Sequence, residues 1–288
     1  MTKEQFVEAV DSLIGFPHMC GIMGGEPLLH PLFEEFCDYA LEKLGKEHLG
    51  LWSTFPKTKE HHREVICRTF DHIFLNDHSL GNIYHAPILV GAEEIIENER
   101  EMFAIVEKCW VQNSWSASIN PKGAFFCEVA GAMSILFDGT PGWKIEPGWW
   151  MRIPKDFASQ MEEYCRKCGC AIPLARRQSI DERDDISPKN IERLKGRSKK
   201  VDQGEYVVSD FKILDQPDPN GKMPDNYPVQ VYKDLEYRGK IAEAYGIFLS
   251  VNEKGNLTPY LKQNWEKGIS DTKVTLMEQF AKELPVLQ

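Results

Sequence analysis

The stretch GIMGGEPLLHPLFEEFCDYA, residues 21–40, decides the fold because it joins a short apolar run to a loop and then to an amphipathic helix. Gly24 and Gly25 allow the backbone to turn sharply and to approach a ligand closely. The carboxylate of Glu26 suits an ammonium group. A purely structural alternative is a tight turn between strand and helix that Glu26 caps. This short motif alone leaves both interpretations open.

Apolar strands alternate with amphipathic helices around this stretch. Thr2 and Gln5 have the spacing of a capping box at the start of the first helix. Such alternation predicts an α/β fold with a parallel sheet and crossover helices. The predicted helices cover residues 2–14, 33–44, 63–70 and 93–106, and the predicted strands cover residues 18–23, 49–55, 72–75 and 87–90.

Polar residues follow the third predicted strand as they follow the first. Asn76, Asp77 and His78 stand directly after that strand. Ligand sites in parallel sheets gather at the carboxyl ends of the strands. We therefore expect residues 76–78 and residues 24–26 to open onto the same cleft. An Asx-type turn is the structural alternative for residues 76–78.

The second half of the chain contains a set of four cysteines. The turn signal Asn-Pro-Lys-Gly predicts a β-hairpin that follows Cys109 and carries Cys127 on its second strand. A predicted helix then delivers Cys165 and Cys168, which have CxxC spacing. Four thiolates supplied in two pairs suit a tetrahedral zinc ion or a [4Fe–4S] cluster equally. The hairpin is expected over residues 115–129 and the helix over residues 154–164.

The remaining cysteines are expected to pack. Cys20, Cys37 and Cys67 fall on predicted strands and helices, where a free cysteine behaves as a small hydrophobe. Cys170 follows the CxxC pair as a fifth thiol. It is interpreted either as an incidental buried residue or as a thiol that exchanges with Cys168.

Residues 21–40 resemble the second strand and the following helix of radical S-adenosylmethionine (radical SAM) barrels, in which a Gly-Gly-Glu segment binds the methionine amino group of the cofactor. The resemblance implies a partial (β/α) barrel over residues 1–108. It also implies that Gly24, Gly25 and Glu26 bind S-adenosylmethionine, and that the polar pair after the third strand, Asn76 and Asp77, adds contacts to it.

The order of the cysteines resembles the twitch domain, a hairpin plus a helix that holds one auxiliary [4Fe–4S] cluster in some radical SAM enzymes. The resemblance implies such a domain over residues 109–185. Its cluster ligands would be Cys109, Cys127, Cys165 and Cys168. Residues 186–288 are predicted to be an α-rich C-terminal extension of unknown role, with helices near residues 233–245 and 271–284.

The signature of the radical SAM family, a CxxxCxxC loop after the first barrel strand, does not occur in this sequence. The chain is therefore expected to be an N-terminally truncated member that does not cleave S-adenosylmethionine alone. The complete enzyme would form a 5′-deoxyadenosyl radical that abstracts hydrogen from a small-molecule or peptide substrate. Its electron donor would be a flavodoxin or a ferredoxin.

Two rival functions use the same residues. One is a non-catalytic structural or interaction protein that binds zinc through the four cysteines. The other is a pseudoenzyme that binds S-adenosylmethionine while a partner supplies the absent loop.

The composition and the net charge limit which kinds of protein this chain can be. Hydrophobic residues make up 42% and charged residues 27%, as in ordinary globular domains. A net charge of −10 disfavours nucleic acids and anionic membranes as partners. The sequence has no apolar run of roughly 18 residues and no signal-peptide pattern. We therefore expect a cytoplasmic protein whose eight cysteines stay reduced.

Overall fold

The structure is a computed structural model that describes residues 1–75, 84–106, 109, 111, 117–152, 154–208, 210–213, 247–251 and 257–261. The chain divides into two compact units. The first, called the sheet unit below, comprises Phe6–Asn82 and Met223–Gln288. The second, called the cysteine unit, comprises Met1–Gln5 and Ile83–Lys222. The domain boundaries expected at residues 108 and 185 stay predictions.

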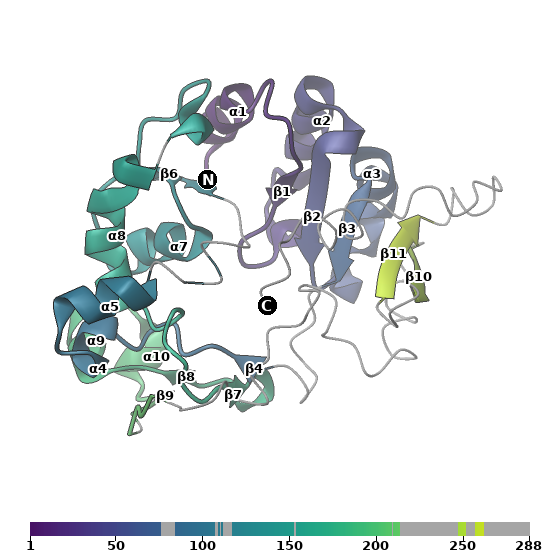
Figure 1. Ribbon diagram of the computed structural model, residues 1–288. Coiled ribbons are helices and arrows are strands. Elements are labelled where there is room, and N and C mark those ends of the chain that lie inside the picture. Colours follow the sequence, from purple (N-terminus) through teal and green to yellow (C-terminus); the bar gives the residue numbers. More distant parts are fainter. Residues whose placement is uncertain are drawn as a thin grey trace. The chain divides into compact units, whose positions relative to one another are not determined.

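The sheet unit alternates strands and helices as the sequence predicts (Figure 1). Its strands and helices are α1 Lys3–Ser12, β1 Cys20–Ile22, α2 Phe33–Leu44, β2 Leu49–Ser53, α3 Arg63–Thr69 and β3 His72–Leu75. Three turns of 3-10 helix connect them, namely η1 Pro27–Leu29, η2 Lys46–His48 and η3 Lys57–His62.

Helix α1 begins at the predicted capping box. The amide nitrogen of Thr2 donates to Oε1 of Gln5 over 2.9 Å, and the amide of Gln5 donates back to Oγ1 of Thr2 over 3.3 Å. Further along α1, the ring of Phe6 stacks on that of Phe36 with centroids 4.0 Å apart. These contacts fix α1 against α2 and confirm the predicted start of the helix.

The sheet is parallel, in the order β1–β2–β3. Leu51 lies opposite Ile22 on one side and Ile73 on the other. Alternate residues point to the same face, so Leu49, Leu51 and Ile73 share a core with the helices. The predicted α/β arrangement is confirmed at this level. The described sheets are small and none of them closes into a barrel.

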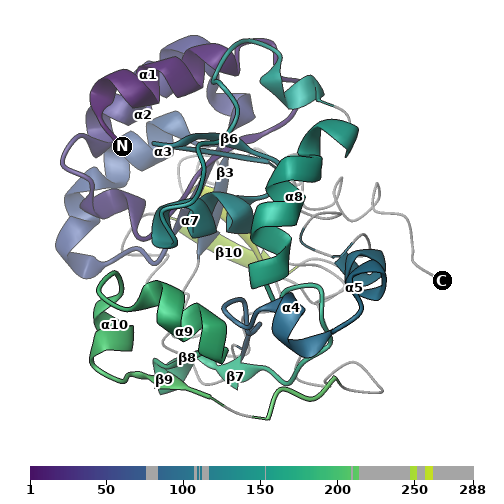
Figure 2. The same cartoon turned by 90° about the vertical axis from the view of Figure 1, so that its left-hand side faces the viewer.

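The cysteine unit is built from short elements around two groups of helices (Figure 2). Its helices are α4 Ala92–Ile95, α5 Glu99–Val106, α7 Glu128–Leu136, α8 Ala158–Tyr164, α9 Pro188–Leu194 and α10 Lys199–Asp202. Its strands are β4 Tyr84–His85, β5 Ser118–Asn120, β6 Gly123–Phe125, β7 Arg177–Gln178, β8 Asp184–Asp185 and β9 Tyr206–Val207. Its 3-10 turns are η4 Trp149–Met151, η5 Pro154–Phe157, η6 Cys165–Lys167 and η7 Ser179–Asp181.

The predicted hairpin is present, and its second strand is shorter than expected. Strands β5 and β6 pair antiparallel, with Ile119 opposite Ala124. The prediction that Cys127 lies on the second strand is wrong, because the strand ends at Phe125 and Cys127 is the N-cap of helix α7. The buried residues of α7 are Ala130, Gly131, Met133 and Ser134, which have the spacing of one helix face and not the alternation of a half-buried strand.

Two further predictions in this unit are wrong. Residues 87–90 form no strand of the parallel sheet; Pro87 has no amide proton to donate, and only Leu89 makes an isolated bridge, to Ile186. The single helix expected over residues 93–106 is two helices, α4 and α5. The side chain of Asn98 accepts a hydrogen bond from the amide of Glu101 over 3.1 Å, which starts a new helix after a break.

The C-terminal part of the sheet unit contains an antiparallel pair that the sequence analysis did not predict. Strand β10 (Ile247–Val251) pairs with β11 (Leu257–Leu261), and β11 lies next to β3 (Figure 1). The helices expected near residues 233–245 and 271–284 lie outside the described residues. Among the helices that are described, none combines the length and apolar character needed to cross a membrane.

Candidate functional site

The backbone is open at the carboxyl end of β1. Gly24 and Gly25 have φ angles of 107° and 58°, in the region that favours glycine. Both residues are exposed, and a methyl group added at either Cα would meet no atom within 4 Å. The peptide groups of this turn are therefore accessible to a ligand, as the Gly-Gly-Glu interpretation requires.

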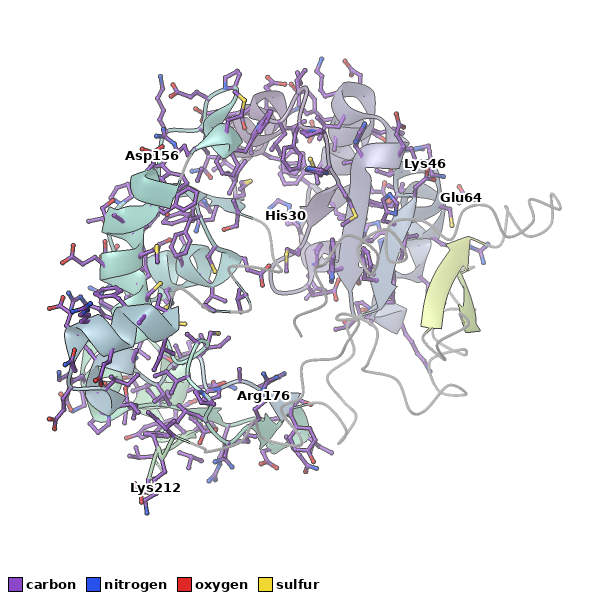
Figure 3. All side chains as sticks on the ribbon, viewed as in Figure 1. His30, Lys46, Glu64, Asp156, Arg176 and Lys212 are labelled. Carbon is purple, nitrogen blue, oxygen red and sulfur yellow. The ribbon has the colours of Figure 1, made fainter. Side chains whose placement is uncertain are left out.

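The carboxylate of Glu26, in contrast, is fully engaged. Its Oε1 accepts from the Leu28 amide over 3.1 Å, which makes Glu26 the N-cap of η1. The predicted structural alternative, a turn capped by Glu26, is thus confirmed. His30, labelled in Figure 3, ends the same turn.

Glu26 also binds the end of β2. The Ser53 hydroxyl donates to Oε1 over 2.7 Å, and the amide and hydroxyl of Thr54 both donate to Oε2 over 2.7 Å. Hydrogen bonds to a charged carboxylate are among the stronger ones in proteins. Glu26 therefore holds the carboxyl ends of β1 and β2 together and fixes the position of the two glycines.

The third strand ends at the same edge of the sheet. Leu75, its last residue, is in register with Ser53 of β2, and the two strands run parallel. Asn76, Asp77 and His78 come next but lie outside the described residues. Their expected contact with the turn at Gly24 stays a prediction.

Five cysteines of the second unit share one hydrophobic core, called the cysteine core below. Sulfur atoms gather around α7 and α8 in Figure 3, where Asp156 marks the turn that precedes α8. Phe125, Phe126, Met133 and Tyr164 supply much of the apolar packing around them. The members are Cys109, Cys127, Cys165, Cys168 and Cys170, and all five are free thiols.

Polar side chains tie the helix that delivers Cys165 to the hairpin that leads to Cys127. Gln160 of α8 is 6% exposed; its Oε1 accepts from the Phe126 amide over 3.0 Å and its Nε2 donates to the Ala124 carbonyl over 3.2 Å. These bonds satisfy buried backbone groups that would otherwise cost free energy. They bring the two pairs of cysteines, which lie far apart in the sequence, into the same core.

The CxxC segment has its own brace. A methyl group at Gly169 would lie 2.3 Å from the Pro87 carbonyl oxygen, so only glycine fits there. The Asn190 side chain, which is fully buried, donates to the carbonyls of Leu89 and Lys167 over 2.8 Å each. Arg193 in turn donates to Oδ1 of Asn190 over 2.8 Å. The chain between Cys165 and Cys168 is therefore held on the backbone of residues 87–90.

The thiols of the cysteine core influence one another. Burial raises the pKa of Cys127 to about 12, and the thiols of Cys168 and Cys109 act in the same direction. Burial also raises the pKa of Cys165. The thiol of Cys170 donates a hydrogen bond to the sulfur of Cys168, which lowers the pKa of Cys168.

The donor set suits a thiolate metal site in its composition. Four thiolates suit zinc or a [4Fe–4S] cluster, and a fifth lies beside them. Within the described residues, however, no three histidine, cysteine, aspartate or glutamate side chains stand in a metal-binding arrangement. Protonated thiols pack as hydrophobes, and they ionise when a metal binds. The four predicted ligands share a core, and their role as ligands stays a prediction.

Three residues of this region, Glu128, Gln160 and Asn190, were not predicted from the sequence. Glu128 is the first residue of α7, and burial raises its pKa to about 8. A carboxylate directly after Cys127 was a visible signal. Nothing in the sequence marks Gln160 and Asn190, because the role of an amide side chain is apparent only when its hydrogen-bond partners are known.

The other three cysteines pack as predicted. Cys37 and Cys67 are buried in the core of the sheet unit, and Cys20 lies partly buried against it. Burial raises the pKa of Cys20 to about 11. None of these thiols belongs to the cysteine core.

The comparisons with known proteins add no relative: no family model, no curated protein and no solved structure matches this chain. The site is therefore interpreted from its own residues.

Proposed function

We propose that this chain is part of a radical SAM enzyme, which binds S-adenosylmethionine at the carboxyl end of β1 and an auxiliary [4Fe–4S] cluster in the cysteine core. The observation that carries the proposal is the exposed Gly24–Gly25 turn at the end of a parallel strand. Ligands of open α/β sheets bind at this edge, where peptide groups are free to contact them. The sequence resemblance supplies the identity of the ligand.

Each residue has a defined part in this proposal. The peptide groups of Gly24 and Gly25 bind the methionine amino group, while Glu26 keeps the turn in place through its bonds to Ser53 and Thr54. Cys109, Cys127, Cys165 and Cys168 hold the cluster. When bound, the cofactors supply the radical chemistry, and the protein supplies binding and orientation.

Binding of S-adenosylmethionine tests the proposal directly. Gly24→Ala places a methyl group where φ is 107°, which strains the turn without filling a pocket. We expect it to weaken binding by at least about 10-fold in calorimetry, since each 1.4 kcal/mol is one factor of ten. The matched control is Gly15→Ala, because Gly15 has a φ of 85° and equally open space. Failure of the unaltered chain to bind S-adenosylmethionine would refute the assignment.

A second experiment concerns activity. The sequence contains no CxxxC segment, so it lacks the loop that presents the reactive three-cysteine cluster in the radical SAM family. We expect no 5′-deoxyadenosine from the reconstituted chain under dithionite. Release of 5′-deoxyadenosine would show that another set of cysteines carries the reactive cluster.

One observation favours the rival function, a structural zinc protein. Glu26 already accepts four hydrogen bonds, so its carboxylate is not free to pair with an ammonium group. Anaerobic reconstitution with iron and sulfide separates the two functions. A cluster gives a brown protein that absorbs in the visible range, whereas a zinc site stays colourless. Retention of zinc in preference to iron, together with no binding of S-adenosylmethionine, would establish the rival.

A further inference from the structure

Phe55 has a backbone conformation that its residue type disfavours. Its φ is 50°, in the left-handed region, where a bulky apolar residue is rarely found. Asp138 and Glu182, the other described residues besides glycine with such a φ, are exposed, whereas the side chain of Phe55 is 2% exposed and packs in the core of the sheet unit. Pro56 follows, and a residue before proline favours an extended conformation. Strained residues of this kind cluster at ligand sites, where surrounding contacts hold them.

The turn that contains Phe55 is tied to Glu26 through a single hydroxyl group. The Phe55 amide donates to Oγ of Ser53 over 2.9 Å, and the Ser53 hydroxyl donates to Oε1 of Glu26 over 2.7 Å. Thr54, the residue between them, donates its amide and its hydroxyl to Oε2 of the same carboxylate. The Ser53 hydroxyl therefore connects the strained backbone at the end of β2 with the carboxylate that holds the Gly24–Gly25 turn.

We propose that Ser53 is a positioning residue for ligand binding at the Gly24–Gly25 turn, because its hydroxyl holds both Phe55 and Glu26 in the conformations that place this turn. The inference rests on the proposed function, in which the ligand is S-adenosylmethionine. Ser53 acts through Glu26, since its own hydroxyl is already engaged both as a donor and as an acceptor. The end of β2 thus sets the affinity of a turn that belongs to β1.

Loss of the Ser53 hydroxyl should reach the turn through Phe55. Glu26 would keep the donors on Leu28 and Thr54, so its carboxylate would stay attached. The Phe55 amide, however, would lose the acceptor at 2.9 Å, and with it a contact that opposes relaxation of its backbone. Relaxation of Phe55 moves the adjacent Thr54 and both of its donors to Glu26. The binding-competent conformation is then less populated, which weakens the apparent affinity.

Calorimetric titration of the full chain with S-adenosylmethionine tests the inference. We expect Ser53→Ala to raise the dissociation constant by about 10-fold, and Ser53→Thr, which keeps the hydroxyl, to raise it by less than about 3-fold. Ser53→Cys fills the same space with a weak hydrogen-bonding group and should behave like Ser53→Ala.

The matched control is Ser12→Ala. Ser12 is also 2% exposed, and its hydroxyl donates to the Ala9 carbonyl over 2.7 Å within the same unit. Its loss removes a buried hydrogen bond far from Glu26 in the sequence, so it should lower the stability and leave the dissociation constant unchanged. Circular dichroism checks that each variant is folded, and Ser53→Cys replaces Ser53→Ala if the latter is not.

Amide hydrogen exchange of the ligand-free chain gives a second readout. The amides of Leu28 and Thr54 donate to the two oxygens of Glu26, and we expect both to exchange at least about 5-fold faster in Ser53→Ala. The amide of Phe36, in helix α2, should exchange at an unchanged rate.

The possible failures are distinguishable. If the unaltered chain does not bind S-adenosylmethionine, the proposed function falls, and this inference with it. If the unaltered chain binds and Ser53→Ala binds equally well, only the positioning role of Ser53 is overturned, whatever the exchange rates. The same conclusion follows if Ser12→Ala weakens binding as much as Ser53→Ala, because the effect is then a general loss of stability.

Discussion

At the carboxyl end of β1 a single carboxylate accepts four hydrogen bonds, whereas five thiols in the cysteine core have mainly one another and apolar side chains as neighbours. The difference follows from solvation. A partly buried carboxylate needs hydrogen-bond donors around it. The donors that surround Glu26 occupy the oxygens that were predicted to bind a ligand. A thiol is neutral and packs as a hydrophobe, so it stays available for a metal.

The two regions also differ in which of their atoms are held in place. Glu26 is fixed by Ser53 and Thr54, so the part of the turn that can adapt to a ligand is the backbone of Gly24 and Gly25. In the cysteine core, Gln160 and Asn190 hold the backbone, and the thiols pack among apolar side chains. Four experiments test this difference.

Metal-linked stability gives the largest effect. With Zn²⁺ at about 1,000 times its dissociation constant, the unaltered chain should gain about 4 kcal/mol in its free energy of unfolding. Cys127→Ser should lose this gain, whereas Cys37→Ser, in the core of the sheet unit, should keep it. Denaturant titrations with and without Zn²⁺ measure both. Equal gains in the two variants would mean that the cysteine core is ordinary packing.

The second experiment concerns the stability that Asn190 contributes by holding the CxxC segment in place. Asn190→Ala leaves the carbonyls of Leu89 and Lys167 without their buried donor, which should cost about 2–4 kcal/mol. Asn190→Asp keeps the acceptor for Arg193 but loses the same two donors, so it should cost a similar amount. Chemical unfolding measures both changes. A loss confined to Asn190→Ala would assign the effect to Arg193 instead.

The carboxylate of Glu26 should matter less, because solvent replaces some of its bonds at the partly exposed turn. We expect Glu26→Ala to lower the free energy of unfolding by about 2–3 kcal/mol and Glu26→Gln by about half of that. Glu8→Ala on the exposed side of α1 is the control, with a change near zero. If Glu26→Ala leaves the stability unchanged, the hydrogen bonds of Glu26 do not stabilise the fold. The carboxylate would then be available to bind a ligand, and the difference from the cysteines would disappear.

The smallest effect concerns pH in the metal-free chain. Burial raises the pKa of Glu128 to about 8, so the folded chain keeps a proton that the unfolded chain loses above its ordinary pKa near 4.5. The folded state is then favoured at low pH, and the free energy of unfolding should fall as the pH rises from about 4.5 to 8. Because Glu128 is only partly buried and solvent screens its charge, we expect the fall to be on the order of 2 kcal/mol.

The variants Glu128→Gln and Glu101→Gln complete this measurement. Glu128→Gln removes the titrating group and should flatten the profile in this range, while Glu101→Gln, on the exposed surface of α5, should leave it unchanged. A flat profile in the unaltered chain would show that Glu128 is solvated in both states.

The sequence predicted residues 6–75 of the sheet unit well because the signals there are local. The alternation of apolar residues predicts α2 at its observed bounds, and the capping box predicts the start of α1. The predictions failed where tertiary contacts decide. Residues 87–90 look like a strand, but their carbonyls bind Asn190 and Gly169 instead of a neighbouring strand. The predicted strand over residues 124–129 ends at Phe125, and Glu128 already begins α7, because a short apolar run suits a strand as well as a helix.

By itself, the amino-acid sequence determined the alternation of strands and helices, the glycine turn and the supply of cysteines, because periodicity, turn chemistry and composition act over a few residues. Only the tertiary structure decided that Glu26 is engaged and that Cys170 lies against Cys168. Both outcomes depend on partners that long-range packing brings together, such as Thr54 for Glu26 and the backbone of Pro87 for Gly169. Distances between groups far apart in the chain are fixed by the core as a whole, and no local pattern encodes them.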